Sequence, residues 1–224
     1  MSLDPLSLER LDEIPDPLGQ VAAAVPPAKV PSERAATRAE RRIHAWVAVG
    51  FALAWLSAAA LVFGLRADLT SPSVLVPIAA WLAGGAGILA LLLRPRERGL
   101  PAGVRAVQHA VWVVPVAYAA GCALVAVPAE GPLTWASLRG CLAISTLTAL
   151  GPLTAAALFL RGSFLSAPGW RGAAVGALAG LAGSIGAHAH CPVQTMGHLL
   201  AAHGAAIAVG AAAGAALGRA GGRP

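Results

Sequence analysis

Long runs of apolar residues, separated by short charged or turn-forming segments, make up most of the chain. Six of these runs contain roughly twenty residues, enough to cross a hydrocarbon core of about 30 Å as a helix. Because lipid offers the backbone no hydrogen-bond partners, each run is expected to be helical. The pattern therefore predicts an all-α integral membrane protein with six transmembrane helices. The predicted spans lie near residues 43–65, 73–93, 107–127, 141–160, 172–190 and 198–217.

The composition agrees with a membrane protein and excludes an ordinary soluble domain. Of the 224 residues, 57% are hydrophobic and only 12% are charged, whereas a soluble domain carries about 25% charged residues. The sequence contains no Walker loop, dinucleotide fingerprint or protease triad signature, and its predicted spans hold no Asp or Glu. Proton-coupled transport normally needs ionisable groups within the membrane. We therefore predict that the chain is not an enzyme and is a poor candidate for such a transporter.

The positions of Lys and Arg predict the orientation in the membrane. If the N-terminus is cytoplasmic, 14 of the 16 basic residues fall in inner segments, and the outer loops hold only Arg66 and Arg139. This asymmetry is the positive-inside pattern of membrane proteins. We expect a multi-pass protein of the bacterial inner membrane with both termini in the cytoplasm. The expected parts are a cytoplasmic segment and linker at 1–42, a membrane domain at 43–218 and a tail at 219–224.

Glycines recur every four residues in the last two predicted spans. They are Gly172, Gly176 and Gly180 in the fifth span, and Gly210, Gly214 and Gly218 in the sixth. Such ridges of small residues let two helix backbones approach closely in lipid. We therefore predict that these two spans pack against each other.

All three cysteines fall in the outer half of the predicted topology. Cys122 lies near the outer end of the third span, where we expect a small buried hydrophobic side chain. Cys141 begins the predicted fourth span, and Cys191 lies in the loop between the fifth and sixth spans. Both are thus expected at a water interface on the oxidising side of the membrane, where disulfides persist. They are the natural candidate pair for redox sensing or metal binding.

The loop around Cys191 is rich in further metal-ligand types and contains no charged residue. Imidazole, thiolate and thioether groups suit borderline and soft ions such as zinc and copper. No CxxC or HExxH spacing is present, so interfacial histidines that ligate nothing are the alternative. The candidate auxiliary ligands are His188, His190, Met196 and His198, and His203 follows one turn into the sixth span.

Two short motifs carry a family resemblance. Arg-Gly-Cys-Leu at 139–142 places a cysteine at the start of the fourth span, and His-Cys-Pro at 190–192 separates the fifth and sixth. The chain resembles the NrsF-like membrane anti-sigma factors, the negative regulators of sigma-F. The resemblance is specific over residues 139–218 and rests on hydropathy and topology over the first three spans. It implies a six-helix regulator that holds a sigma factor and senses stress through the two motif cysteines.

The resemblance gives a role to the N-terminal segment. Asp4 and Pro5 form a good helix start, and Pro15 ends that helix. Such a short amphipathic helix is marginal alone in water but can order in a partner's groove. The implied partner is an extracytoplasmic-function-type sigma factor, with no direct contact to nucleic acid. The candidate contact residues are Leu6, Leu8, Glu9, Leu11, Asp12 and Ile14.

A small metal-binding or metal-transporting inner-membrane protein is the alternative function. It would use the cysteines and histidines of the outer half as a relay of ligands. A transporter should also offer ligands on the inner side, where the chain has no cysteine and only His44 and His109 nearby. The inducing signal is left open, because metals, oxidants and light-generated oxidants all react with thiols.

Overall fold

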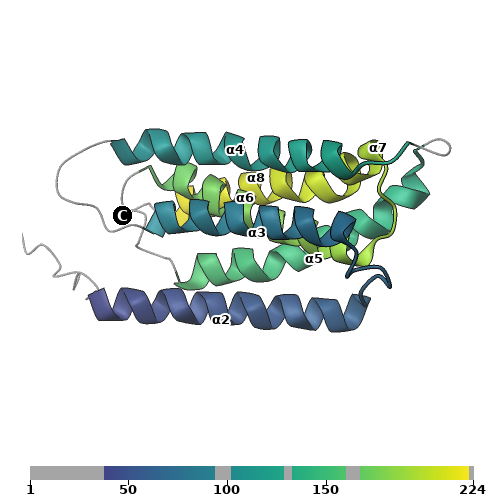
Figure 1. The fold of residues 1–224 in the computed structure, drawn as a ribbon. Coiled ribbons are helices and arrows are strands. Elements are labelled where there is room, and N and C mark those ends of the chain that lie inside the picture. The colour runs from purple at the N-terminus through teal and green to yellow at the C-terminus, as the bar shows by residue number, and fades with distance from the viewer. Residues whose placement is uncertain (1–37, 94–101, 129–132, 160–166, 222–224) are drawn as a thin grey trace, which may run out of the picture. The chain divides into compact units, whose positions relative to one another are not determined.

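The computed structural model describes residues 38–93, 102–128, 133–159 and 167–221. Within these ranges the chain is helical apart from short connections and one isolated β-bridge between Val127 and Thr195. Six helical segments are long and apolar enough to cross a membrane, which confirms the predicted all-α architecture. The elements (Figure 1) are α2 (Arg38–Phe63), α3 (Pro72–Leu93), α4 (Ala102–Val125), α5 (Trp135–Phe159), α6 (Pro168–His190), α7 (Met196–His198), the π-helix η2 (Leu199–Gly204) and α8 (Ala205–Gly221). The last three follow one another directly and form the sixth apolar segment.

Helix α6 is the central element of residues 41–224. It packs against α3, α4, α5 and α8, and most of its residues from Gly172 to His188 are buried. Its sequence explains this position, because Gly, Ala and Ser predominate along it and let neighbouring helices approach from every side. Polar side chains at its end, Ser184 and His188, are consequently enclosed by protein.

The glycine ridges of α6 and α8 bring their two backbones together, as predicted. A Cβ atom on Gly176 would overlap the carbonyl oxygen of Gly210, and one on Gly172 would overlap that of Gly214. No side chain other than hydrogen fits at these positions. The pairing of the fifth and sixth apolar segments therefore depends on glycine itself.

Helix α5 begins earlier than the predicted fourth span. It starts at Trp135 because the hydroxyl of Thr134 accepts a 3.3 Å hydrogen bond from the backbone N–H of Ser137, which caps the first turn. Cys141 therefore lies inside the helix, about 9 Å along its axis, rather than at its first residue. This corrects the predicted start of the fourth span at Cys141, and the Cys141 side chain is half-buried.

Three connections meet at the end of the bundle that carries Cys191, which we call the cysteine end. In the α2–α3 connection, the backbone N–H of Arg66 donates to the carbonyl of Ala189 (3.0 Å). The guanidinium of Arg66 donates to the carbonyl of Cys191 (3.1 Å). In the α4–α5 connection, the N–H of Val127 donates to the carbonyl of Gln194 (3.0 Å). The segment that follows α6 is thus held from two sides.

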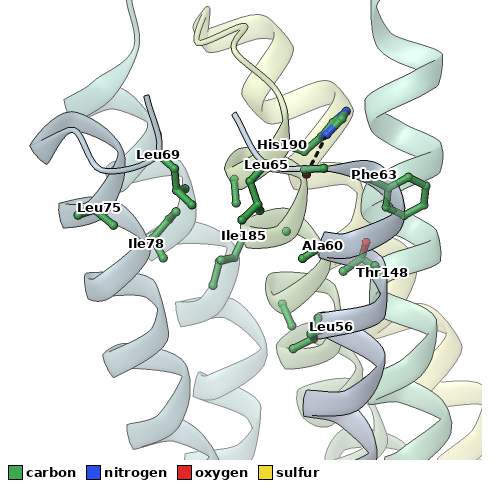
Figure 2. Close-up of a pocket in the computed structure, with 15 residues that line it drawn as sticks. Leu56, Ala60, Phe63, Leu65, Leu69, Leu75, Ile78, Thr148, Ile185 and His190 are labelled. Atoms are coloured by element: carbon green, nitrogen blue, oxygen red, sulfur yellow. Dashed lines mark hydrogen bonds between the residues drawn. The ribbon is translucent and has the colours of Figure 1, made fainter. Parts of the chain in front are cut away.

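Helix α2 is enclosed less by protein than α6 is. The indole N–H of Trp55 donates to the carbonyl of Leu147 on α5 (3.1 Å). An apolar cavity of about 260 Å³ lies between α2, α3 and α6 near the cysteine end. Figure 2 shows Leu56 of α2, Ile78 of α3 and Ile185 of α6 around this cavity. Direct contacts between α2 and the other helices are therefore interrupted on this side.

We expect Gly176→Leu to disrupt the contact between α6 and α8. The added side chain would meet backbone rather than a movable side-chain tip, so the cost should be on the order of 3 kcal/mol or more. Thermal unfolding of the full-length protein in detergent measures the effect. The control is Gly87→Leu on α3, where an added Cβ meets nothing within 4 Å. Equal unfolding temperatures for the two variants would contradict the close contact.

Candidate functional site

Four potential ligand side chains converge at the cysteine end. They are Cys141, Cys191, His198 and His203, and we call them the Cys/His group. Their ligand atoms all lie within 4.8 Å of one another. Cys141 is half-buried and the other three are buried. The group therefore joins α5, the end of α6, α7 and η2 around one point.

Cys191 reaches the group because α6 ends directly before it. Its backbone N–H still donates to the carbonyl of Ala187 (2.8 Å), while its own backbone is extended, with φ −87° and ψ 125°. Pro192 favours this conformation, because the helical region is disfavoured for a residue that precedes proline. The thiol then lies beside α7, with Sγ 3.4 Å from Nε2 of His198.

The π-helix η2 brings the two histidines to the same side. In a regular α-helix each residue turns by about 100°, so positions 198 and 203 would point about 140° apart. A π-helix has a wider turn with i→i+5 hydrogen bonds, and such segments are frequent at functional sites. The rings of His198 and His203 accordingly lie with centroids 5.2 Å apart.

Two buried serines support the irregular helix. The hydroxyl of Ser145 on α5 donates to the carbonyl of Ala202 (2.9 Å), and that of Ser184 on α6 donates to the carbonyl of His203 (2.7 Å). Non-α backbone at membrane depth needs such partners, because lipid supplies none. These serines were not predicted as site residues, although they are rare polar side chains in their apolar segments.

The imidazoles of the group have few hydrogen-bond partners. Neither ring nitrogen of His203 has one in the structure, and Nδ1 of His198 also lacks one. Burying a polar atom without a partner costs about 1–3 kcal/mol. The arrangement therefore leaves nitrogen lone pairs available to a ligand in the interior of the group.

The structure separates the predicted auxiliary ligands. Only His198 belongs to the Cys/His group. His188 is buried beside it, with its ring centroid 6.4 Å from that of His203. Nδ1 of His190 lies 3.3 Å from the carbonyl oxygen of Gly64 (Figure 2), and Met196 packs against an apolar cluster. His203, which was not among the predicted auxiliary ligands, takes a place in the group.

The thiols of Cys122 and Cys191 lie in different environments. Cys122 is fully buried in the apolar cluster with Trp81 and Tyr118, as expected for a small hydrophobic side chain. A hydrogen bond from the thiol of Cys141 holds the pKa of Cys191 below its ordinary value, against the opposing effect of burial. Thiolates rather than thiols bind metals and react with oxidants, so the contact between the two cysteines favours the reactive form of Cys191.

Comparison with known families agrees with the resemblance in the sequence. The family model described as Negative regulator of sigma F matches residues 29–222. The chain therefore belongs to the NrsF family, whose members are negative regulators of a sigma factor and not enzymes. Searches of curated proteins and of solved structures found no match.

The predicted sigma-factor contacts lie outside the described residues. The proposed helix between Asp4 and Pro15 falls within residues 1–37, and the family match begins at residue 29. The roles of Leu6, Leu8 and the neighbouring contact residues accordingly stay predictions.

We expect Ser184→Ala to loosen η2, because the carbonyl of His203 loses its donor within a buried site. The expected destabilisation is about 1–3 kcal/mol, measured as a lower unfolding temperature in detergent. Ser57→Ala on the exposed side of α2 is the matched control. Indistinguishable unfolding of the two variants would show that the hydroxyl does not support the π-helix.

Proposed function

We propose that the chain is a membrane-bound anti-sigma factor that sequesters an extracytoplasmic-function-type sigma factor through its cytoplasmic N-terminal segment. A stress signal at Cys141 and Cys191, on the periplasmic side of the membrane, releases the sigma factor. One observation carries the proposal. The two cysteines, remote in sequence, meet in a single Cys/His group in a chain that belongs to a family of sigma-factor regulators.

The distribution of charge supports this orientation. The cysteine end carries Arg66 in the α2–α3 connection, and Arg139 lies in the first turns of α5, whereas the other 14 basic residues belong to the opposite side in the proposed topology. Because positive charge accumulates in cytoplasmic loops, the cysteine end faces the periplasm. The N-terminal segment and the thiols then lie on opposite sides of the membrane, as a transmembrane signal requires.

The two thiols can register a signal because one lies within a helix and the other directly follows a different helix. Cys141 lies on α5, and Cys191 directly follows α6. A peroxide would oxidise the two thiols to a disulfide and be reduced to two molecules of water. A metal ion would instead take both thiolates as ligands. Either event fixes the separation of these helices, and close-packed interfaces respond to such changes by switching between discrete arrangements.

Arg66 offers a route from the thiols to the N-terminal segment. It follows α2 and donates to the carbonyl of Cys191 (3.1 Å). Asp68 holds the guanidinium through a 2.7 Å contact, and this hydrogen bond keeps the pKa of Asp68 below its ordinary value. A change in the Cys191 segment therefore acts on the end of α2, whose other end continues into the sigma-binding segment.

We expect Leu8→Asp combined with Leu11→Asp to abolish binding of the sigma factor. The double change places charge on the apolar face that would enter the partner's groove, where an unpaired buried charge is strongly unfavourable. Co-purification of the sigma factor with full-length protein, and transcription from a sigma-dependent promoter, measure the effect. Binding should be lost and transcription should become constitutive.

The matched control for this test is Gln20→Asp combined with Ala22→Asp. It adds the same charge to the segment beyond Pro17, outside the proposed helix. The control should bind and repress like the original protein. If the leucine variant also represses normally, the contact surface is elsewhere.

We expect Cys141→Ser and Cys191→Ser each to abolish the graded transcriptional response to thiol-reactive stress. Neither a disulfide nor a shared ligand set can form with one thiol removed. The response is read as induction of the sigma-dependent promoter by peroxide and by cadmium. Cys122→Ala is the control, because Cys122 packs in the apolar cluster apart from the group. Normal induction in both serine variants would exclude these thiols as the sensor.

A further inference from the structure

We infer that the Cys/His group binds one zinc ion as a closed, four-ligand centre in the resting protein. The site itself does not depend on the proposed function. Its role as the target of the stress signal, argued below, does rest on that function.

The donor set selects a borderline or soft cation. Two sulfur and two imidazole donors are a Cys₂His₂ set, the composition of structural zinc sites. The group contains no carboxylate, and magnesium, calcium and manganese prefer oxygen ligands. Four protein ligands also leave no open position, so the site is of the structural and not the catalytic type.

The distances are close to those of a tetrahedral site. With Zn–S near 2.3 Å and Zn–N near 2.0–2.1 Å, tetrahedral ligand atoms are about 3.6–3.8 Å apart along S–N and S–S edges. Sγ of Cys191 and Nε2 of His198 are already 3.4 Å apart. All other pairs lie within 4.8 Å, so closing the widest pair around zinc shortens it by at most about 1.5 Å, shared between two side chains.

Charge balance favours this ligand set inside a membrane protein. Two thiolates neutralise the two positive charges of zinc, and two neutral imidazoles add none. The complete centre is therefore uncharged, which avoids the large cost of burying a net charge away from water. The thiolates alone, or the ion alone, would carry that cost.

The buried nitrogens of His203 provide independent support. Its ring is fully buried, and neither nitrogen has a hydrogen-bond partner. The π-helix directs this ring toward the group, and Ser184 holds the backbone of the same residue (2.7 Å). Coordination by zinc would satisfy one of these nitrogens. The π-helix and the Ser184 hydroxyl thus position the His203 imidazole, and zinc would be the partner that this ring otherwise lacks.

Zinc would also determine how the thiols respond to oxidants. Coordination holds both cysteines as thiolates and ties α5 to the α6–η2 segment. A peroxide converts the two thiolates to a disulfide, taking up two electrons and two protons and leaving two molecules of water. The disulfide retains no thiolate for the ion, so zinc departs and the two histidines lose their common partner. Loss of the ion is then the structural change that the regulator transmits.

Metal analysis of the full-length protein, purified in detergent under reducing conditions, tests the site. We expect about one zinc per chain by mass spectrometry of the metal. Replacement by Co²⁺ should give the intense visible bands of a tetrahedral thiolate site, and zinc X-ray absorption should report two sulfur and two nitrogen neighbours. Substoichiometric metal together with absent Co²⁺ bands would overturn the inference without any variant.

Variants then assign the ligands. His203→Ala and His198→Ala should each weaken zinc binding by at least about 100-fold, because even outer-shell changes cost 10–100-fold. His190→Gln is the matched control, since His190 adjoins Cys191 in sequence but contacts Gly64 instead. Equal zinc affinity in His203→Ala and His190→Gln would exclude the proposed ligand set.

Peroxide treatment tests whether oxidation of the two thiols releases the zinc ion, which is a separate question from whether zinc binds. Loss of two thiols should release one zinc to a coloured chelator, with the Cys122 thiol retained. Oxidation without zinc release would overturn the proposed coupling. A protein that binds zinc but no sigma factor would refute the proposed function alone, and a metal-free protein that still represses and responds would refute the zinc centre alone.

Discussion

Helices α6 and α8 approach so closely at their glycines that a single Cβ atom would overlap the opposite backbone. In lipid, where apolar side chains gain nothing by leaving the solvent, such packing is a main source of helix association. This contact fixes α8, and therefore η2, against α6. The small side chains of α6 then accept α3, α4 and α5 on its other sides. The polar groups at the cysteine end are enclosed as a result of this arrangement.

The enclosed region contains the π-helix and buried polar side chains of the described residues. A π-helix leaves carbonyls that regular helical pairing would satisfy, and Ser145 and Ser184 provide hydroxyl donors for two of them. Departures from local regularity are expected at functional sites, where structure supports geometry that the sequence alone would not favour. Here the π-helix and the end of α6 bring two thiols and two imidazoles, those of the Cys/His group, close together. The group thereby joins α5, the end of α6, α7 and η2.

Helix α2 has a different relation to this core. It follows the N-terminal segment directly, and cavities interrupt its contacts with α3 and α6. Trp55 and Arg66 provide specific polar links to the rest of the bundle. Helix α2 and the cysteine end are thus linked mainly through the connection that contains Arg66.

Local patterns in the sequence were sufficient to predict the six helices from apolar length and the α6–α8 pairing from glycine spacing. Two short motifs were sufficient to indicate the family and the candidate cysteine pair. Each of these signals is a property of residues that are near one another in the chain. The start of α5 was also encoded locally, in the cap formed by Thr134. The composition of the Cys/His group was decided by tertiary structure. His190 and Cys191 are adjacent, yet the extended backbone before Pro192 directs them to different partners. His203 joins His198 because η2 changes the helical phase between them, and that phase depends on buried donors from two other helices.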